Sequence, residues 1–291
     1  MPSASATLTA LTRDAWQSLE AAHLERADAL TSGHRARSSR GERHAIEDFL
    51  FEYYNAKPRH LRRWHPGAGV GLVDARERST QRWHGERDGV TALDVEAFRA
   101  ARGDTVDYVR RLLAATAGRR PLLGCFGMHE WAMVYRSDDA ERRHGLPLRL
   151  GGAGTDAAVE ANPLVCTHFD AFRFFTADAV PRNAHALTRD GQVGMDQPGC
   201  LHATMDLYKW CLKLGPAVPG DLLLDCFELA LDVRRVDMQA SPYDVSSYGL
   251  AAIPVETPEG KSEYAARQRA FTRRAAPLRE RLIEVCDAVL A

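Results

Sequence analysis

The chain has 291 residues, of which 45% are hydrophobic and 26% are charged, and its formal net charge is −1. This composition is typical of a soluble globular protein, and the near-neutral balance argues against a protein that coats nucleic acid nonspecifically. No apolar run approaches the length of about 18 residues that crosses a bilayer, and the N-terminus does not resemble a secretory signal. We therefore expect a cytoplasmic protein without a membrane partner.

The six cysteines are scattered along the chain, and no two have the Cys-x-x-Cys spacing of a structural zinc site. A chain of this length can bury a large core without disulfide bonds, so we expect reduced thiols. The same length permits one large domain over 1–291. The alternative is a subdivision of that domain near residues 118–122.

The first third of the chain combines predicted helices with a basic connector. Apolar residues at helical spacing predict an amphipathic helix over 9–30, and the arginine-rich segment 32–41 is expected to be a connector. A dense second helix is predicted over 43–54. Residues 66–71, Pro-Gly-Ala-Gly-Val-Gly, must form a turn or loop, and 72–89 is expected to be irregular, with room for one short hairpin.

The middle of the chain is predicted to alternate helices with long loops. Residues 91–103 and 106–117 are expected to form two helices, each ended by a glycine. The glycine-rich and proline-rich segments 144–156 and 176–199 are expected to be long ordered loops, which are often functional in compact domains. A short buried helix or strand is expected over 169–175.

The last third is predicted to be the most regular part. Helices are expected over 200–214, 221–238 and 261–290, and 241–260 is expected to be a loop with at most one short strand. Pro277 should kink or split the last helix. The whole pattern predicts a mainly α fold, namely a large single helical domain with long ordered loops and minor β structure.

Three stretches share a composition typical of a functional site: a cysteine, a histidine two or four residues later, a nearby carboxylate and aromatic side chains. They begin at Cys125, Cys166 and Cys200. In the third stretch the histidine and the aspartate are four residues apart, so they share one face of the predicted helix. Together the stretches supply the candidate catalytic residues His129, Glu130, His168, Asp170, His202 and Asp206.

Two kinds of chemistry fit this composition. Histidines and carboxylates can bind a transition metal, for which His129, His168 and His202 are the candidate ligands. They can also act as an acid–base pair in which the carboxylate orients the imidazole. The alternative is three separate buried histidines, each hydrogen-bonded in an aromatic core. The sequence does not decide whether the three stretches meet in space.

A basic group and an aromatic group extend the candidate site. Arg62, Arg63 and Trp64 combine cations with an aromatic ring, as binding to a phosphate backbone requires. The alternative for this segment is a solvated surface offset by neighbouring acids. Aromatic side chains elsewhere could line a pocket for a planar ligand, although core packing is their default role. These candidates are Trp131, Phe172, Phe174 and Trp210.

Several catalytic motifs are missing from the chain. It has no Gly-x-Ser-x-Gly nucleophile elbow. His129-Glu130 lacks the second histidine of the zinc-protease helix, and 66–71 is not followed by the Lys-Ser/Thr of a phosphate-binding loop. Each of the three cysteines is close to a histidine in sequence, which does not establish the thiol–imidazole pair of a cysteine nucleophile.

Six phrases in the chain resemble a family of bacterial proteins commonly labelled 3-methyladenine DNA glycosylase, and the resemblance covers roughly residues 10–290. The phrases are HAIEDFLFEYY, LRRWHPGAG, LGCFGMHEWAMVYR, CTHFDAFRFFT, QPGCLHATMDLYKW and MQASPYDVSSYG. The chain lacks a clear helix-hairpin-helix motif followed by a catalytic aspartate. The resemblance implies a DNA repair enzyme that hydrolyses the N-glycosidic bond of an alkylated purine in damaged DNA, with the base flipped out of the stack.

This resemblance would give each candidate residue a role. Asp206 or Asp170 would activate water or stabilise the sugar cation, and His202 or His168 would orient that carboxylate. A cationic alkylated base would gain a cation–π interaction from stacking on aromatic rings. The stacking residues would be Trp131, Phe172, Phe174 and Trp210, and the residues holding the DNA strand would be Arg62, Arg63 and Trp64.

Two other hypotheses stay open. The first is a metal-dependent enzyme acting on a small molecule, with Fe, Zn or Mn held by His129, His168, His202 and neighbouring carboxylates. The near-neutral charge and the long loops favour it. The second is a binding module without catalysis. The glycosylase hypothesis requires no cofactor, so metal content separates it from the first alternative. The oligomeric state does not follow from the sequence.

Overall fold

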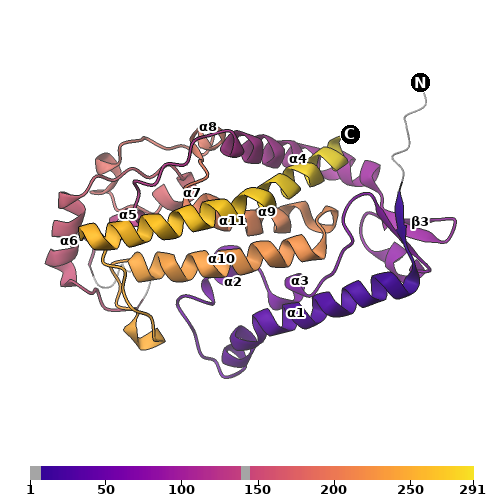
Figure 1. Cartoon of the computed structure of the whole chain (residues 1–291), viewed down its shortest axis with the longest axis horizontal. Helices are drawn as coiled ribbons and strands as arrows, with labels where there is room; N and C mark the ends of the chain where they lie inside the picture. The colour runs from indigo at the N-terminus through magenta and orange to yellow at the C-terminus, as the bar shows by residue number, and fades with distance from the viewer. Residues whose placement is uncertain (1–7, 139–144) are drawn as a thin grey trace.

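The computed structural model describes residues 8–138 and 145–291, and it confirms a mainly helical fold with minor β structure. Long helices from the last third of the chain lie side by side at its centre (Figure 1). α9 (Leu201–Leu214) packs against α10 (Gly220–Ala240), and α11 (Pro258–Leu290) contacts both. α4 (Val95–Ala117) packs along α11. These four helices form the frame on which the other elements are placed.

The burial pattern of α9 explains its central position. Leu201 and Met205 lie on one side of this helix and Leu207 lies on the other, and all three are buried. A helix that is hydrophobic all round is stable only when other elements surround it. Two polar residues of α9, His202 and Asp206, are therefore carried into the interior with the apolar ones.

A small sheet closes one end of the molecule, next to the N-terminal helix α1 (Arg13–Ser39). The turn of its hairpin is formed by Asp88 and Gly89, whose φ angles of 51° and 76° are those that a two-residue hairpin turn requires. The strand order is β1-β2-β4-β3, with β1 parallel to β2 and the other pairs antiparallel. The strands are β1 (Thr9–Leu11), β2 (Val70–Val73), β3 (His84–Arg87) and β4 (Val90–Leu93).

The remaining elements are short and lie around the four-helix frame. Residues 176–199 and 241–260 are mostly loop, as predicted. The short α-helices are α2 (Phe49–Tyr53), α3 (Pro58–Leu61), α5 (Met128–Ala132), α6 (Gly151–Ala161), α7 (Phe169–Phe172) and α8 (Gln192–Met195). Single 3-10 turns occur at Arg76–Thr80, Val180–Arg182, Gly215–Ala217 and Ser246–Tyr248.

The predicted boundaries in the first 60 residues are wrong at three places. Residues 9–11, expected to begin the first helix, pair with β2 as the strand β1, so α1 starts only at Arg13. α1 continues through most of the expected connector 32–41, because arginine is a good helix former and Arg37 is paired with Glu47 and Asp48 at 2.9 and 3.0 Å. The helix expected over 43–54 is reduced to α2. Before it, the Asp48 carboxylate accepts the backbone N–H of His44 at 2.8 Å and holds the chain in a turn.

Tertiary packing also overrides glycine and proline signals. Gly103 does not end a helix, so the two helices expected over 91–117 are the single helix α4. A glycine inside a helix costs only about 1 kcal/mol relative to alanine, and α4 packs on α11. α11 likewise continues through Pro277, and α6 begins at Gly151 inside the segment that was expected to be a loop.

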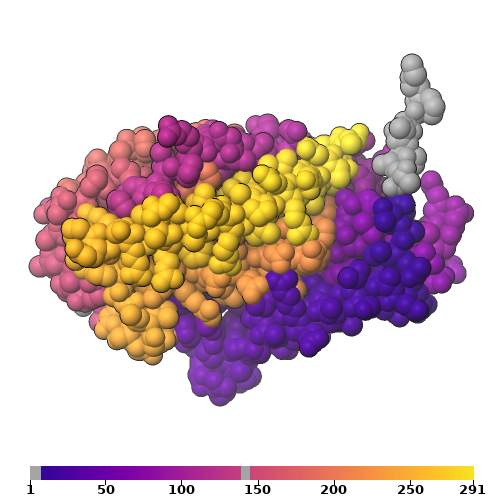
Figure 2. Space-filling view, viewed as in Figure 1, coloured from indigo at the N-terminus to yellow at the C-terminus, as the bar shows by residue number. Residues whose placement is uncertain are grey.

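One hydrophobic core includes residues from both sides of 118–122, among them Val109 and Leu112 on α4 and Leu282 on α11. The space-filling view shows α11 (yellow) crossing the face in view, with α10 beside it (Figure 2).

Among the helices that the structure describes, none has the combined length and apolarity needed to cross a membrane.

Candidate functional site

The three histidines predicted from separate stretches meet in the interior. His129 lies on α5, His168 directly precedes α7, and His202 lies in the first turn of α9. The ring centroids of His129 and His202 are 4.5 Å apart, and those of His168 and His202 are 5.6 Å apart. Each ring is at most 4% exposed. The sequence did not decide whether the three Cys/His stretches meet in space. In the structure they do, and His202 lies between the other two histidines.

A first group of possible ligands surrounds His129 and His202. One donor atom from each of His129, Glu130, His202 and Asp237 lies within 4.8 Å of the others. Nε2 of His129 is 3.0 Å from Oδ1 of Asp237, yet neither atom has a hydrogen-bond partner of acceptable geometry among the described residues. Two polar atoms that are close but misaligned are the arrangement expected when both point toward one shared ion.

A second group lies next to the first, one turn further along α9. It contains His168, Asp170 and Asp206, whose donor atoms again lie within 4.8 Å of one another. Nε2 of His168 is 3.5 Å from Oδ2 of Asp206 and has no hydrogen-bond partner among the described residues. Here, however, a cation is already present: the Lys209 ammonium lies 2.8 Å from both Asp170 and Asp206.

The outer nitrogen of two imidazoles is held by a neighbouring side chain. Nδ1–H of His168 donates to Asp196 at 2.9 Å, and Asp196 in turn accepts a hydrogen bond from the Gln192 amide at 3.1 Å. Nδ1 of His129 is 3.4 Å from the sulfur of Cys125. In both rings Nε2 is thereby directed toward the carboxylates. Metal-binding histidines are typically held in this way, because the second hydrogen bond selects the tautomer and the ring orientation.

Buried cations compensate part of the negative charge. The guanidinium of Arg234, which has no exposed surface, is 2.9 Å from Glu130 and 3.2 Å from Asp237. The first group therefore has two carboxylates facing one guanidinium. Asp170 of the second group is paired with Lys209 and also with arginines at the surface. In the first group, either a protonated His129 or an ion balances the second carboxylate, whereas the second group is largely compensated by Lys209 and the arginines.

The pKa values of the site follow from burial and from these neighbours. Burial disfavours a charged His129, but the Asp237 carboxylate outweighs it and raises the pKa of His129 well above its ordinary value. Burial opposes the charged form of His168 in the same way, and Asp196 raises its pKa nonetheless. Burial raises the pKa of the Cys166 and Cys200 thiols, so both stay protonated, which argues against a cysteine nucleophile.

The site approaches the surface at Asp170. This carboxylate is itself buried, but its partners Arg173 and Arg189 have side chains that are 45% and 50% exposed. Each guanidinium lies over an aromatic ring, Arg173 over Phe174 at 4.4 Å and Arg189 over Phe169 at 4.6 Å. Asp170 is thus the member of the histidine cluster that is paired with exposed side chains, and these two cations on two rings form a rim beside it.

The aromatic candidates are mostly part of the core. Trp131 has no exposed surface, and its indole N–H donates to the carbonyl of Ala240 at 2.8 Å. Phe172 and Trp210 are also buried. Phe174 is half-buried at the rim described above. Of the four, it is the best placed to touch a ligand that arrives from solvent.

The basic candidates lie on another part of the fold. They follow or end α3, which packs on α1 and α10. Arg62 donates to both carboxylate oxygens of Asp28 at 2.6 and 2.9 Å. Trp64 is buried beneath Arg78, whose guanidinium is 5.3 Å from the ring centroid. No described contact of Arg62 or Trp64 involves the histidine cluster, and Arg63 lines a separate cavity.

Several residues of the cluster were missed in the sequence. Asp237, Arg234 and Asp196 lie outside the three Cys/His stretches. A signal for the first two existed, because Arg234 and Asp237 are three residues apart on a long helix whose other buried residues are almost all apolar. Asp196 lies in a loop and carries no such signal. Tyr54, whose hydroxyl donates to Asp206 at 2.9 Å, was noted only as part of a helix.

Comparison of the chain with family models, with curated proteins and with solved structures finds no match in any of the three.

Proposed function

We propose that the protein is a metal-dependent enzyme acting on a small molecule, with one ion held by the first group: His129, Glu130, His202 and Asp237. The observation that carries the proposal is the contact between His129 and Asp237, 3.0 Å long and without hydrogen-bond alignment. A buried polar pair that does not hydrogen-bond is unfavourable by itself. An ion between the two atoms would supply the missing partner for both.

The spacing and the donor types support one ion of the Fe, Zn or Mn type. Donors that bind one tetrahedral ion at about 2.1 Å lie roughly 3.4 Å from one another. The donor atoms of the first group lie within 4.8 Å of each other, so side-chain movements on the order of 1 Å would bring them into place. Two imidazoles with two carboxylates suit a borderline metal rather than Ca or Mg. Such an ion would act as a Lewis acid toward an oxygen of the substrate.

The second group would supply acid–base chemistry beside the ion. His168 stacks on His202, and its Nε2 is 3.5 Å from Asp206. Asp196 holds the opposite side of the ring, so His168 keeps its orientation while Nε2 exchanges a proton. The substrate would enter at Arg173 and Arg189, the exposed partners of Asp170.

Elemental analysis of protein purified without chelator tests this proposal. We expect on the order of one Fe, Zn or Mn ion per chain, and its loss in His129→Ala and Asp237→Asn. His23→Ala is the matched control, because His23 is also buried but hydrogen-bonds to Leu61 at 2.7 Å outside the cluster. The control variant should keep its metal. Metal-free wild-type protein whose thermal stability does not change on adding any of the three metals would refute the proposal.

A base-excision enzyme acting on alkylated DNA is the second candidate. It is supported by the sequence resemblance and by one surface feature, the half-buried Phe174 beneath Arg173 and close to Asp170. In this candidate a flipped purine would stack on Phe174, and Asp206 or Asp170 would stabilise the sugar cation.

Release of free methylated purine from alkylated DNA separates the two candidates. The base-excision enzyme should be active in chelator and should lose activity in Asp206→Asn and Phe174→Ala. Absence of base release from wild-type protein, with or without metal, would eliminate this second candidate and leave the first unaffected.

A further inference from the structure

The two groups of possible ligands differ at the carboxylate oxygen that faces an imidazole. In the first group, Nε2 of His129 faces Oδ1 of Asp237 at 3.0 Å, and neither atom has a hydrogen-bond partner among the described residues. The guanidinium of Arg234 is closest to the other oxygen of Asp237, Oδ2, at 3.2 Å. Within the described chain, the oxygen that faces His129 is therefore not hydrogen-bonded to any cation.

In the second group, the corresponding oxygen is bound by the Lys209 ammonium. Nε2 of His168 faces Oδ2 of Asp206 at 3.5 Å, and Nζ of Lys209 donates to that same oxygen at 2.8 Å. Nζ also donates to Oδ2 of Asp170 at 2.8 Å, so a single ammonium joins the two carboxylates. The ammonium thus contacts the oxygen that a metal ion bound to His168 and Asp206 would share.

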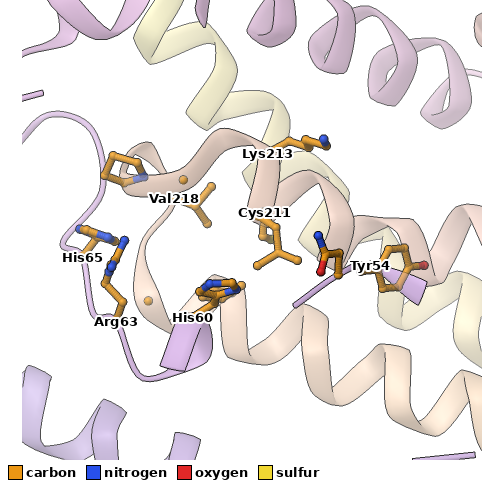
Figure 3. A pocket seen from close by; sticks show the side chains of 13 residues that line it. Tyr54, His60, Arg63, His65, Cys211, Lys213 and Val218 are labelled. Carbon is orange, nitrogen blue, oxygen red and sulfur yellow. The ribbon is translucent and has the colours of Figure 1, made fainter. Parts of the chain in front are cut away.

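Other hydrogen bonds hold the two carboxylates around this ammonium. Tyr54 donates its hydroxyl to Oδ1 of Asp206 at 2.9 Å, which leaves Oδ2 for Lys209. Figure 3 shows Tyr54 at the far end of a neighbouring cavity, with its hydroxyl turned away from that cavity. Arg189 donates to both oxygens of Asp170, but no hydrogen bond between Arg189 and Asp206 is described. Among the described residues, Lys209 is the cation that hydrogen-bonds to both carboxylates.

The surroundings of Lys209 favour a permanent positive charge. Two carboxylates within hydrogen-bonding distance stabilise the charged form of a lysine, and buried carboxylates without a cation would be costly. Asp170 and Asp206 are both buried, while the side chain of Lys209 is 18% exposed. The ammonium also lies 4.5 Å from the ring centroid of Trp210, which adds a cation–π interaction. The chain therefore supplies its own cation to the second group.

We propose that the Lys209 ammonium takes the place of a second metal ion, so that the protein works with one ion in the first group and one fixed ammonium in the second. An ammonium attracts an anionic oxygen, but it is not a Lewis acid and does not generate hydroxide from a bound water. Activation of water would therefore belong to the first group. The proposal rests on the proposed function for the role of the first ion, whereas the cation of the second group is tested separately.

The metal content of Lys209→Ala tests the proposal. Alanine removes the ammonium and leaves His168, Asp170 and Asp206 as a donor set that suits Mn or Zn. Each protein is incubated with excess Mn or Zn and desalted, and its metal content and thermal unfolding are then measured. We expect Lys209→Ala to hold one more ion per chain than the wild-type protein, and added metal to raise its unfolding temperature more than that of wild type.

Three further variants control this measurement. Lys213→Ala removes an exposed lysine one turn later on the same helix, α9, and should hold as much metal as wild type. Lys209→Arg keeps the positive charge and should show no gain. Combining His168→Ala with Lys209→Ala should abolish the gain, because one of the three donors is then missing.

Two results would overturn the proposal. One is folded Lys209→Ala protein that holds no more metal than wild type. The other is Lys209→Ala protein that stays unfolded in the presence of Mn and Zn, because an ion would then not replace the ammonium. The metal content of wild type bears on the proposed function by itself. Metal-free wild type together with one ion in Lys209→Ala would refute the ion of the first group and support the role given to Lys209.

Discussion

At the scale of single residues, Asp196 orients one of the three clustered histidines, His168. It accepts the Nδ1–H of His168 with one carboxylate oxygen and the Gln192 amide with the other. Both oxygens are therefore occupied by donors. The orientation of the His168 ring toward Asp206 depends on this carboxylate, although Asp196 itself is not among the possible ligands.

Asp196→Asn should weaken metal binding and leave the fold intact. The asparagine amide group would face a donor from either His168 or Gln192, so one of the two hydrogen bonds is lost. Asp196 orients His168, which is not a ligand of the proposed ion but stacks on the ligand His202, so we expect a loss of metal affinity of about 10-fold, the low end of the range for residues behind a metal site. Competition with a chromogenic chelator measures this affinity. Asp244→Asn, a change at a half-buried aspartate that accepts the backbone N–H of Ser246 outside the cluster, should have no effect on metal affinity. Equal affinity in wild type and Asp196→Asn would contradict the role given to Asp196.

At the scale of elements, two glycines on neighbouring helices have opposite surroundings. A Cβ atom at Gly103, inside α4, would meet only the Arg99 side chain at 3.7 Å. A Cβ atom at Gly260, in the first turn of α11, would lie 2.0 Å from the carbonyl oxygen of Pro254. No neighbouring atom thus requires a glycine at position 103. Gly260, in contrast, allows the start of α11 to approach the preceding loop.

The two alanine variants should change stability in opposite directions. Gly103→Ala should raise the free energy of unfolding by about 0.5–1 kcal/mol, because alanine loses less backbone entropy on folding into the continuous helix α4. Gly260→Ala should lower it by about 1–3 kcal/mol, since the clash with Pro254 forces the backbone to move. Urea unfolding measures both values. A destabilising Gly103→Ala would mean that the helix is interrupted there.

At the scale of the whole molecule, the N-terminal part contains several histidines kept neutral by burial. Burial lowers the pKa of His65 to about 3. His84, Arg63, Arg78 and His23 all face it, and each of them disfavours a charged His65 further. Burial also lowers the pKa of His84, whose ring stacks on that of His65 at 5.8 Å.

This arrangement predicts a loss of stability in weak acid. The ordinary pKa of histidine is 6.5 and that of folded His65 is about 3, so between these values the unfolded chain binds a proton that the folded chain does not. Stability is therefore complete above about pH 6.5 and falls as the pH is lowered toward 3. Urea unfolding at about pH 7 and about pH 5 should show this fall in wild type. His65→Gln should show a smaller fall, and His185→Gln, outside this group, should match wild type. An identical pH dependence in His65→Gln would contradict the prediction.

The sequence by itself determined the helical class and the residues around which the site is built. Hydrophobic periodicity is a local property, so the long helices in the last third were placed within a few residues of their true ends. The unusual grouping of His, Asp and aromatic residues in an apolar context identified all of His129, His168 and His202, and α9 carries His202 and Asp206 on one face as the spacing required.

Only the tertiary structure decided which residues meet and where several elements end. Asp237 and Asp196 join the cluster because α10 and the loop after α8 fold back onto α9, and no local pattern in the chain encodes that contact. Helix limits at Ser39 and across Gly103 depend in the same way on packing partners far along the chain. The free energy of these contacts exceeds the differences of about 1 kcal/mol in local propensity from which a sequence pattern is read.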